Sequence, residues 1–406
     1  MTTLLEDLIA DDAIGELFRN NYSSDSYKTG IAPLDYMLGY RLNVFDDNDN
    51  VVDSYPSLGF NGGCYVMSIG KSSTAKTSTM LFIAGMIVRQ FEQGSIIHYD
   101  LEQAMNMTRA KNMLKMNVKE LKTKYVLRKG QNSIEDIKKS IMELYKKKMS
   151  DEKYWYYSDK KDEFGNEIHM CQPTIVIIDS IPSLTIKYNE NDKKQWMKLE
   201  EVTSQTERMR LTGEVGRMYS DMLPYVNEAN IILISINHIK VKADLGFVKS
   251  PAELLYLKQD ESLPCGRATI HYSNYLLKNI AIGAEKFNLE DDGFDGFGIR
   301  MEVIKSRSNQ AGRGVMLIYD TLKGISPVRT CIRFAKDNGL LGGNKNATYF
   351  IDYKDKKFPM RTVETFFNEN KEMYGIMYKQ ILPYLEKSLA CVTPEEVAVD
   401  DELFAY

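Results

Sequence analysis

Four short apolar runs constrain the fold more than any other feature of this sequence. They span Cys64–Ile69, Ser95–Asp100, Thr174–Asp179 and Asn230–Asn237. Nearly continuous apolar strands are typical of a parallel sheet that is buried on both faces. Helical patterns follow the first run, over Ser78–Phe91, and precede the last, from about Met209 to Val226. We therefore predict an α/β fold with a mainly parallel central sheet flanked by helices.

Further segments extend this pattern. Apolar runs at about Tyr275–Gly283, Ile299–Lys305 and Gly314–Tyr319 predict extra, antiparallel strands at the C-terminal side of the sheet. Lys153–Gln172 predicts a hairpin insertion. Lys240–Pro264 has no clear periodicity, and a loop this long is usually functional or disordered.

Both ends of the chain differ from its middle. Residues 2–19 predict an amphipathic helix that either packs on its own core or docks on a neighbouring subunit. Helices are expected near 361–370 and 371–388. Beyond Lys387 the chain has five acids and no basic residue, which predicts an acidic tail.

Charge and composition exclude some classes of protein. The 406 residues carry 52 basic and 56 acidic side chains, and a net charge of −4 taken alone disfavours a nucleic-acid binder. Without the five acids of the tail the net charge is about +1. The net charge of the whole chain therefore does not decide whether part of the protein binds nucleic acid. No apolar run approaches the ~20 residues of a membrane span. The N-terminus lacks the basic segment of a signal peptide, and five cysteines form no C-x-x-C pair, so we expect a cytoplasmic protein.

The segment after the first run predicts a phosphate-binding loop, Gly70-Lys71-Ser72-Ser73-Thr74-Ala75-Lys76-Thr77. It lies between an apolar strand and an apolar helix, which is the context that a G-x-x-x-x-G-K-[ST] loop requires. Backbone N–H groups and the helix dipole then favour phosphate, Lys76 reaches the β- and γ-phosphates, and the Thr77 hydroxyl binds Mg²⁺. Ala75 stands where glycine is usual, and the alternative is a Ser/Thr-rich turn with a chance Lys-Thr pair.

Polar residues at the ends of the other runs suit the same site. Asp179 can hold Mg²⁺, usually through water. Asp100 and Glu102 share a face of an extended strand, and one of them can orient or deprotonate the attacking water. Asn237 and His238 can sense a γ-phosphate. Each of these residues could instead be an ordinary polar cap at a strand end.

In this order the segments resemble the RecA-type strand-exchange recombinases, most closely the UvsX recombinases of tailed phages. The likeness covers roughly residues 30–340 and includes Ile236-Asn237-His238, Pro264-Cys-Gly-Arg-Ala, Val303-Ile-Lys305-Ser-Arg307 and the segment from Tyr319 to Pro327. It implies a RecA-like P-loop ATPase core at 29–340. A small N-terminal helical module and linker would occupy 1–28, and a small C-terminal module with the acidic tail would occupy 341–406.

The resemblance also implies roles in a site for ATP and Mg²⁺. Catalytic roles fall on Glu102, Lys76, His238, Lys305 and Arg307, and the metal-site residues are Thr77 and Asp179. Nucleotide contacts are expected from Gly70, Lys71, Ser72, Ser73, Thr74, Ala75, Lys76, Thr77, Ser78, Arg109 and Asn237. Arg109 stands where the family often has a tyrosine that stacks on adenine, and an Arg plane can stack as well.

Two of these residues are implied to act between subunits. Lys305 and Arg307 match basic residues that reach the γ-phosphate held by the adjacent subunit of a filament, like an arginine finger. The alternative is a basic strand end that faces solvent.

The resemblance places two DNA-binding loops at about 185–210 and 240–266. Lysines there can follow phosphates while apolar side chains separate or stack bases. The DNA-binding candidates are Lys193, Lys194, Arg208, Arg210, Lys240, Lys242, Lys249 and Arg267. The alternative is a pair of solvated, charge-mixed loops.

The implied function is a DNA-dependent ATPase that forms ATP-bound filaments on single-stranded DNA and catalyses homologous pairing and strand exchange. Such a protein serves recombination, repair and replication. Its expected partners are single-stranded DNA, homologous duplex DNA, further copies of the chain, and single-strand-binding and loader proteins, in the host cytoplasm if a phage encodes it. The alternatives are a RecA-fold hexameric DNA helicase and a non-catalytic RecA-fold accessory protein.

Overall fold

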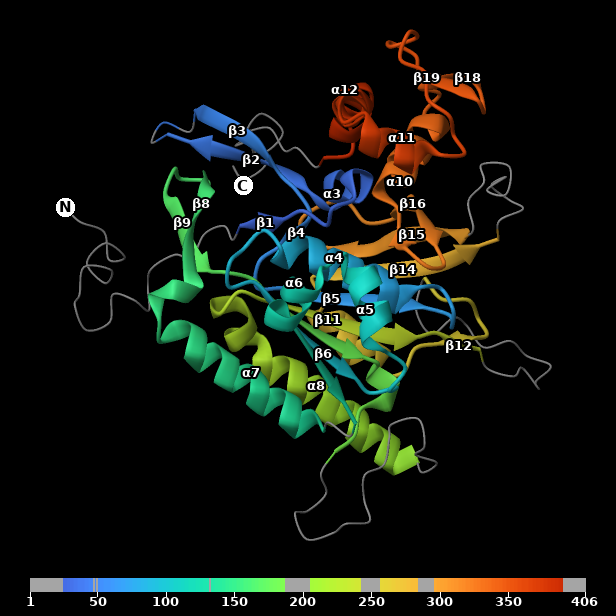
Figure 1. The fold of residues 1–406 in the computed structure, drawn as a ribbon. Coiled ribbons are helices and arrows are strands. Elements are labelled where there is room, and N and C mark those ends of the chain that lie inside the picture. Colours follow the sequence, from blue (N-terminus) through green and yellow to red (C-terminus); the bar gives the residue numbers. More distant parts are fainter. Residues whose placement is uncertain are drawn as a thin grey trace, which may run out of the picture.

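A nine-stranded sheet runs through the centre of the computed structural model, which describes residues 25–389 except Asp47, Asp49 and the stretches 131–132, 187–204, 242–255 and 284–295 (Figure 1). The strand order is β17-β16-β15-β14-β5-β11-β10-β6-β7. The strands are β5 (Tyr65–Gly70), β6 (Ser95–Asp100), β7 (Tyr125–Lys129), β10 (Thr174–Asp179), β11 (Ile231–His238), β14 (Tyr275–Ile282), β15 (Gly296–Ser306), β16 (Arg313–Asp320) and β17 (Gly324–Ile325).

The direction of the strands confirms the predicted, mostly parallel sheet. Every pair from β14 through β5, β11, β10 and β6 to β7 is parallel. The pairs β14–β15, β15–β16 and β16–β17 are antiparallel, as predicted. The expectation for β14 was wrong on one side, where it pairs in parallel with β5. The reason is that α9 (Gly266–Tyr272) intervenes and returns the chain to the edge where β5 starts.

Helices cover both faces of the sheet, which explains why its central strands β5, β10 and β11 are almost entirely buried. On one face lie α4 (Lys76–Val88), α5 (Met107–Leu114) and α6 (Val118–Lys124), and on the other lie α7 (Ile134–Met149) and α8 (Gln205–Glu228) (Figure 1). Successive residues of β10 alternate between the two clusters. Ile175 and Ile177 pack with α4, whereas Val176 and Ile178 pack with α7 and α8.

Small hairpins and short elements lie around the sheet. The predicted insertion is a hairpin of β8 (Trp155–Lys161) and β9 (Glu167–Cys171), which follows η1 (Glu152–Tyr154). Its Tyr156 hydroxyl donates to Asp25 Oδ2 at 2.8 Å, next to β1 (Ser26–Tyr27), which pairs with β4 (Phe60–Asn61). The hairpin of β2 (Tyr40–Phe45) and β3 (Val51–Ser57) was not predicted. Strands β12 (Lys240–Val241) and β13 (Glu261–Ser262) pair on either side of the stretch 242–255, and η2 (Ile181–Ser183) follows β10.

A third apolar cluster joins the C-terminal elements to α3 (Ala32–Leu38). The two helices expected near 361–370 and 371–388 are present as α11 and α12. The C-terminal elements are α10 (Pro327–Asp337), β18 (Leu341–Asn344), β19 (Ala347–Phe350), α11 (Val363–Glu369) and α12 (Glu372–Glu386). The hydroxyls of Tyr36 in α3 and Tyr378 in α12 lie 2.6 Å apart. The helix expected over 2–19 and the acidic tail lie outside the described residues.

Over the described ranges, no helix is long and apolar enough to cross a bilayer.

Candidate functional site

The polar strand ends converge at one edge of the sheet. The parallel register sets Asp179 beside Asp100, and His238 beside Gly70. In open α/β sheets, ligands bind in the crevice outside the carboxyl ends of the strands. The edge formed by β5, β6, β10 and β11 is therefore the candidate site.

The backbone of the loop after β5 has the conformation that glycine favours. At Gly70 a Cβ atom would lie 2.6 Å from the Asn279 carbonyl oxygen and 2.7 Å from Thr74 Oγ1, so no side chain fits. Ala75 has φ 54° and ψ 28°, in the left-handed region, although it carries a methyl. Ser73 also has a positive φ of 60°. The loop therefore curls tightly into α4 without the second glycine of the motif.

Lys76 is a buried cation at the start of α4. Only 4% of its surface is exposed, and its Nζ donates to the carbonyl oxygens of Gly70 and Lys71 at 3.1 and 2.8 Å. Burial lowers the pKa of Lys76 to about 8, and the nearby Asp179 and Glu102 partly oppose that effect. A cation held only by neutral carbonyl oxygens is suited to a phosphate, which would offer it a charged acceptor.

Thr77 and Asp179 form the second part of the site. The Thr77 hydroxyl donates to Asp179 Oδ2 at 2.8 Å. Hydroxyl and carboxylate oxygens fit Mg²⁺, which proteins commonly bind with one or two side chains plus substrate phosphates. Across the described ranges, no group of three or more His, Cys, Asp or Glu side chains could hold a metal. The pair thus fits a magnesium ion that a nucleotide helps to bind.

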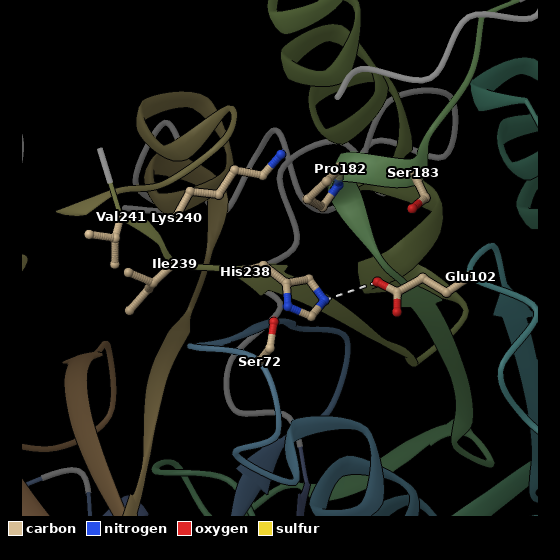
Figure 2. Close-up of a pocket in the computed structure, with 8 residues that line it drawn as sticks. All are labelled: Ser72, Glu102, Pro182, Ser183, His238, Ile239, Lys240 and Val241. Atoms are coloured by element: carbon tan, nitrogen blue, oxygen red, sulfur yellow. Dashed lines mark hydrogen bonds and ion pairs between the residues drawn. The ribbon is translucent and has the colours of Figure 1, made fainter. Parts of the chain in front are cut away.

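Glu102 and His238 form the third part (Figure 2). Glu102 Oε1 accepts a hydrogen bond from Ser180 Oγ at 2.6 Å and lies 2.9 Å from His238 Nε2. The hydrogen bond from His238, followed by that from Ser180, holds the pKa of Glu102 at about 2 against the opposing effect of burial. Asp100 is 2% exposed and accepts the backbone N–H groups of Ala104 and Met105. Glu102 is therefore the acid of this pair that faces the site.

An open hollow of about 670 Å³ lies beside these groups. Figure 2 shows the Glu102 and His238 side chains pointing toward one another and in direct contact, whereas the Lys240 side chain extends away from them. The residues that line the hollow are Ser72, Glu102, Pro182, Ser183, His238, Ile239, Lys240 and Val241. Pro182 and Ser183 lie just before the first predicted DNA-binding loop, and Lys240 begins the second. Both loops thus start at the rim of the hollow.

Four residues that were predicted to contact the nucleotide also contact other parts of the protein. Lys71 Nζ lies 3.2 Å from Glu261 Oε1 in β13. Asn237 is fully buried, and its amide donates to the Pro264 carbonyl at 2.7 Å. Ser78 is also buried, and it accepts from Arg109 Nη2 at 3.4 Å. Their contacts with nucleotide stay predictions.

Lys305 and Arg307 do not reach the site within one chain. Lys305 pairs with Leu276 of β14, and Leu276 in turn pairs with Met67 of β5. Lys305 is thus two strands away from β5, at the level of a residue that precedes Gly70 by three positions. Its Nζ donates to the Ile270 carbonyl at 2.8 Å, and Arg307 Nη2 donates to the His271 carbonyl at 3.5 Å. A role for these two cations at a nucleotide therefore requires a second copy of the chain.

Most of the predicted DNA-binding residues lie outside the described part of the chain. This holds for Lys193, Lys194, Lys242 and Lys249, and for the side chains of Arg208 and Arg267. Arg210 is exposed on α8, and Lys240 is exposed where it lines the hollow. DNA contact by these residues stays a prediction.

Two buried polar residues near the site were not predicted from the sequence. His98 lies in β6 with no exposed surface, and its Nε2 is 3.8 Å from Asp179 Oδ2. Glu261 is 2% exposed and pairs with Lys71. The sequence does contain a signal for His98, because it is a polar residue within an apolar run. It precedes Asp100 by two positions, and the two side chains therefore lie on the same face of the strand.

Comparisons with known proteins leave the family open. A scan against protein-family models finds no match, and a search of curated proteins finds none either.

Proposed function

We propose that this chain is a Mg²⁺-dependent and DNA-dependent ATPase of the RecA recombinase type, which polymerises on single-stranded DNA and catalyses homologous pairing and strand exchange. The observation that carries the proposal is the convergence of Lys76, Thr77, Asp179, Glu102 and His238 at one sheet edge. That set has a phosphate cation, a metal-site pair, a carboxylate for water and a group that can sense the γ-phosphate.

Lys76 and the loop would hold the phosphates of ATP. Lys76 Nζ is already removed from water and donates to two neutral carbonyl oxygens. A phosphate oxygen can take the place of one of these carbonyls as a charged acceptor. Thr77 and Asp179 would hold Mg²⁺, which when bound neutralises phosphate charge and orients the γ-phosphate. The hydrogen bonds to the Gly70 and Lys71 carbonyls already position Lys76 Nζ at the loop, so it needs little reorganisation during the reaction.

Glu102 would orient the attacking water. In the described structure the Glu102 carboxylate is occupied by Ser180 and His238, which keeps it ionised but weakly basic. If His238 turns to a γ-phosphate oxygen, Glu102 loses the contact that lowers its pKa most, and its basicity rises. The His238–Glu102 pair would thus link phosphate binding to activation of water.

The same residues would pass the nucleotide state to DNA. His238 lies at the end of β11, and the chain continues through Ile239 and Lys240 into the second predicted loop. Pro182 and Ser183 at the rim lead to the first. ATP would act as a ligand that favours the DNA-competent arrangement of both loops. Lys305 and Arg307 of an adjacent copy would complete the charge stabilisation.

Electron microscopy of the protein with single-stranded DNA and a non-hydrolysable ATP analogue tests the assembly. Helical filaments on DNA are expected only when the analogue is present. Closed rings would favour the hexameric helicase, and nucleotide binding without any assembly would favour the accessory protein. Lys305→Ala and Arg307→Ala separate the roles further, because they should prevent ATP-dependent filaments while leaving ATP binding by the single chain intact.

A further inference from the structure

His98 is a buried histidine beneath the metal-site acid. It lies in β6 on the face that α4 covers, because Ile96, two residues before it, packs in the cluster of α4. Asp179 follows Ile177 of that same cluster by two residues, so both side chains occupy one layer between sheet and helix. None of the His98 surface is exposed.

One ring nitrogen of His98 has a defined partner. Nδ1 lies 2.9 Å from the hydroxyl of Tyr125 in β7. Burial, followed by the charges of Asp100 and Asp179, raises the pKa of the Tyr125 hydroxyl, so it keeps its proton. If this hydroxyl donates to Nδ1, the single N–H of a neutral imidazole is on Nε2.

The other ring nitrogen faces the carboxylate. Nε2 lies 3.8 Å from Asp179 Oδ2, and it makes no hydrogen bond in the described structure. A lone pair on Nε2 would face negative charge, whereas an N–H there would face an acceptor. Oδ2 also accepts from Thr77 at 2.8 Å, so Thr77 and His98 approach the same oxygen.

We propose that His98 is a positioning residue for Asp179: Tyr125 fixes the tautomer of His98, and the Nε2–H of His98 holds Oδ2 so that Oδ1 is presented to Mg²⁺. The proposal rests on the proposed nucleotide site. The gap of 3.8 Å exceeds a hydrogen bond, which requires about 3 Å. A rotation of the carboxylate toward His98 would close the gap, and the Thr77 hydroxyl would then be free to hold the metal. Partners of this kind keep a metal ligand in its binding orientation.

The first test reads the tautomer without nucleotide or metal. The chain has only four histidines, so ¹⁵N spectra of protein labelled at the imidazole nitrogens resolve few signals, and His98→Gln assigns the one of interest. We expect the His98 proton on Nε2, and a change of that signal in Tyr125→Phe. A proton on Nδ1 would overturn the proposal.

The second test measures the Mg²⁺ concentration that half-saturates binding of a fluorescent ATP analogue. His98→Phe should weaken apparent Mg²⁺ affinity about 10- to 100-fold and leave binding without Mg²⁺ unchanged. His98→Gln, whose amide N–H can reach the place of Nε2–H, should restore most of it, whereas His98→Asn should not. His169→Phe, on the exposed hairpin, is the matched control and should behave like wild type.

The outcomes separate the two proposals. Equal Mg²⁺ affinity in wild type and His98→Phe, or in Gln and Asn variants, would overturn the role of His98 alone. If His98→Phe does not fold, the comparison of Gln with Asn decides. Wild-type protein that shows no Mg²⁺-dependent nucleotide binding would refute the proposed function, and the role of His98 in it.

Discussion

Replacement of Ala75 by glycine tests the conformation of the loop between β5 and α4. Ala75 has a left-handed backbone, which costs a residue with a Cβ atom about 1–2 kcal/mol relative to glycine. Glycine in turn makes the unfolded chain more flexible, at a cost of about 0.4–1 kcal/mol. It also removes a partly buried methyl that packs on the core, which is worth at most about 0.8 kcal/mol. Together these effects should change the free energy of unfolding of Ala75→Gly by between a loss of about 0.8 kcal/mol and a gain of about 1.6 kcal/mol.

The matched control is Ala110→Gly inside α5. Ala110 is fully buried and helical, so glycine there costs about 1 kcal/mol of helix propensity and about 0.8 kcal/mol for the lost methyl. The two variants should thus differ by roughly 2 kcal/mol in urea denaturation followed by circular dichroism. A loss for Ala75→Gly as large as that for Ala110→Gly would refute the left-handed conformation, and with it the argument that alanine occupies a glycine position here.

Three further changes test other parts of the structure. Glu102→Gln should lower ATP turnover about 10²- to 10⁴-fold with nucleotide binding retained, as phosphate release and fluorescent-nucleotide binding would measure, and unchanged turnover would remove Glu102 from the reaction. Burial lowers the pKa of Lys148 from 10.5 to about 8, so between these pH values the unfolded chain binds more protons. The stability of wild type relative to Lys148→Met should therefore rise from pH 8 to 10.5, and a flat difference in urea midpoints would contradict the burial of this cation. Lys71→Met should lower the free energy of unfolding by about 1 kcal/mol, because it leaves the buried charge of Glu261 without its partner. Adding Glu261→Gln should restore that stability. Additive losses in the double-mutant cycle would mean that the ion pair contributes nothing.

The central strands could be predicted because burial on both faces leaves a strong signal in the sequence. Thr174–Asp179 and Ser95–Asp100 were predicted at their observed bounds. The direction of β14 could not be predicted on both sides, since an apolar run carries no information about which strand lies beside it. That information comes from the crossover through α9, whose length and direction depend on tertiary packing.

The candidate site shows a similar division. Residues at strand ends, such as Asp179 and Glu102, were found because parallel strands bring their carboxyl ends together. His98 was missed because a single polar residue within a run looks like a tolerated exception. The strand pattern alone could not separate Asp100 from Glu102, and only the resemblance favoured Glu102. The hydrogen bonds from Ala104 and Met105 show that Asp100 holds the backbone.

The apolar cluster that α3 shares with the C-terminal helices has a consequence for folding during synthesis. Tyr36 and Tyr378 are 342 residues apart in the chain, and translation at about 5–20 residues per second separates their synthesis by roughly 20 to 70 seconds. Throughout that interval Tyr36 and Leu58 have none of the C-terminal side chains that later bury them. The nascent chain thus exposes this apolar surface until α12 leaves the ribosome. A messenger truncated before that point would yield a protein that keeps the residues of the candidate site but aggregates.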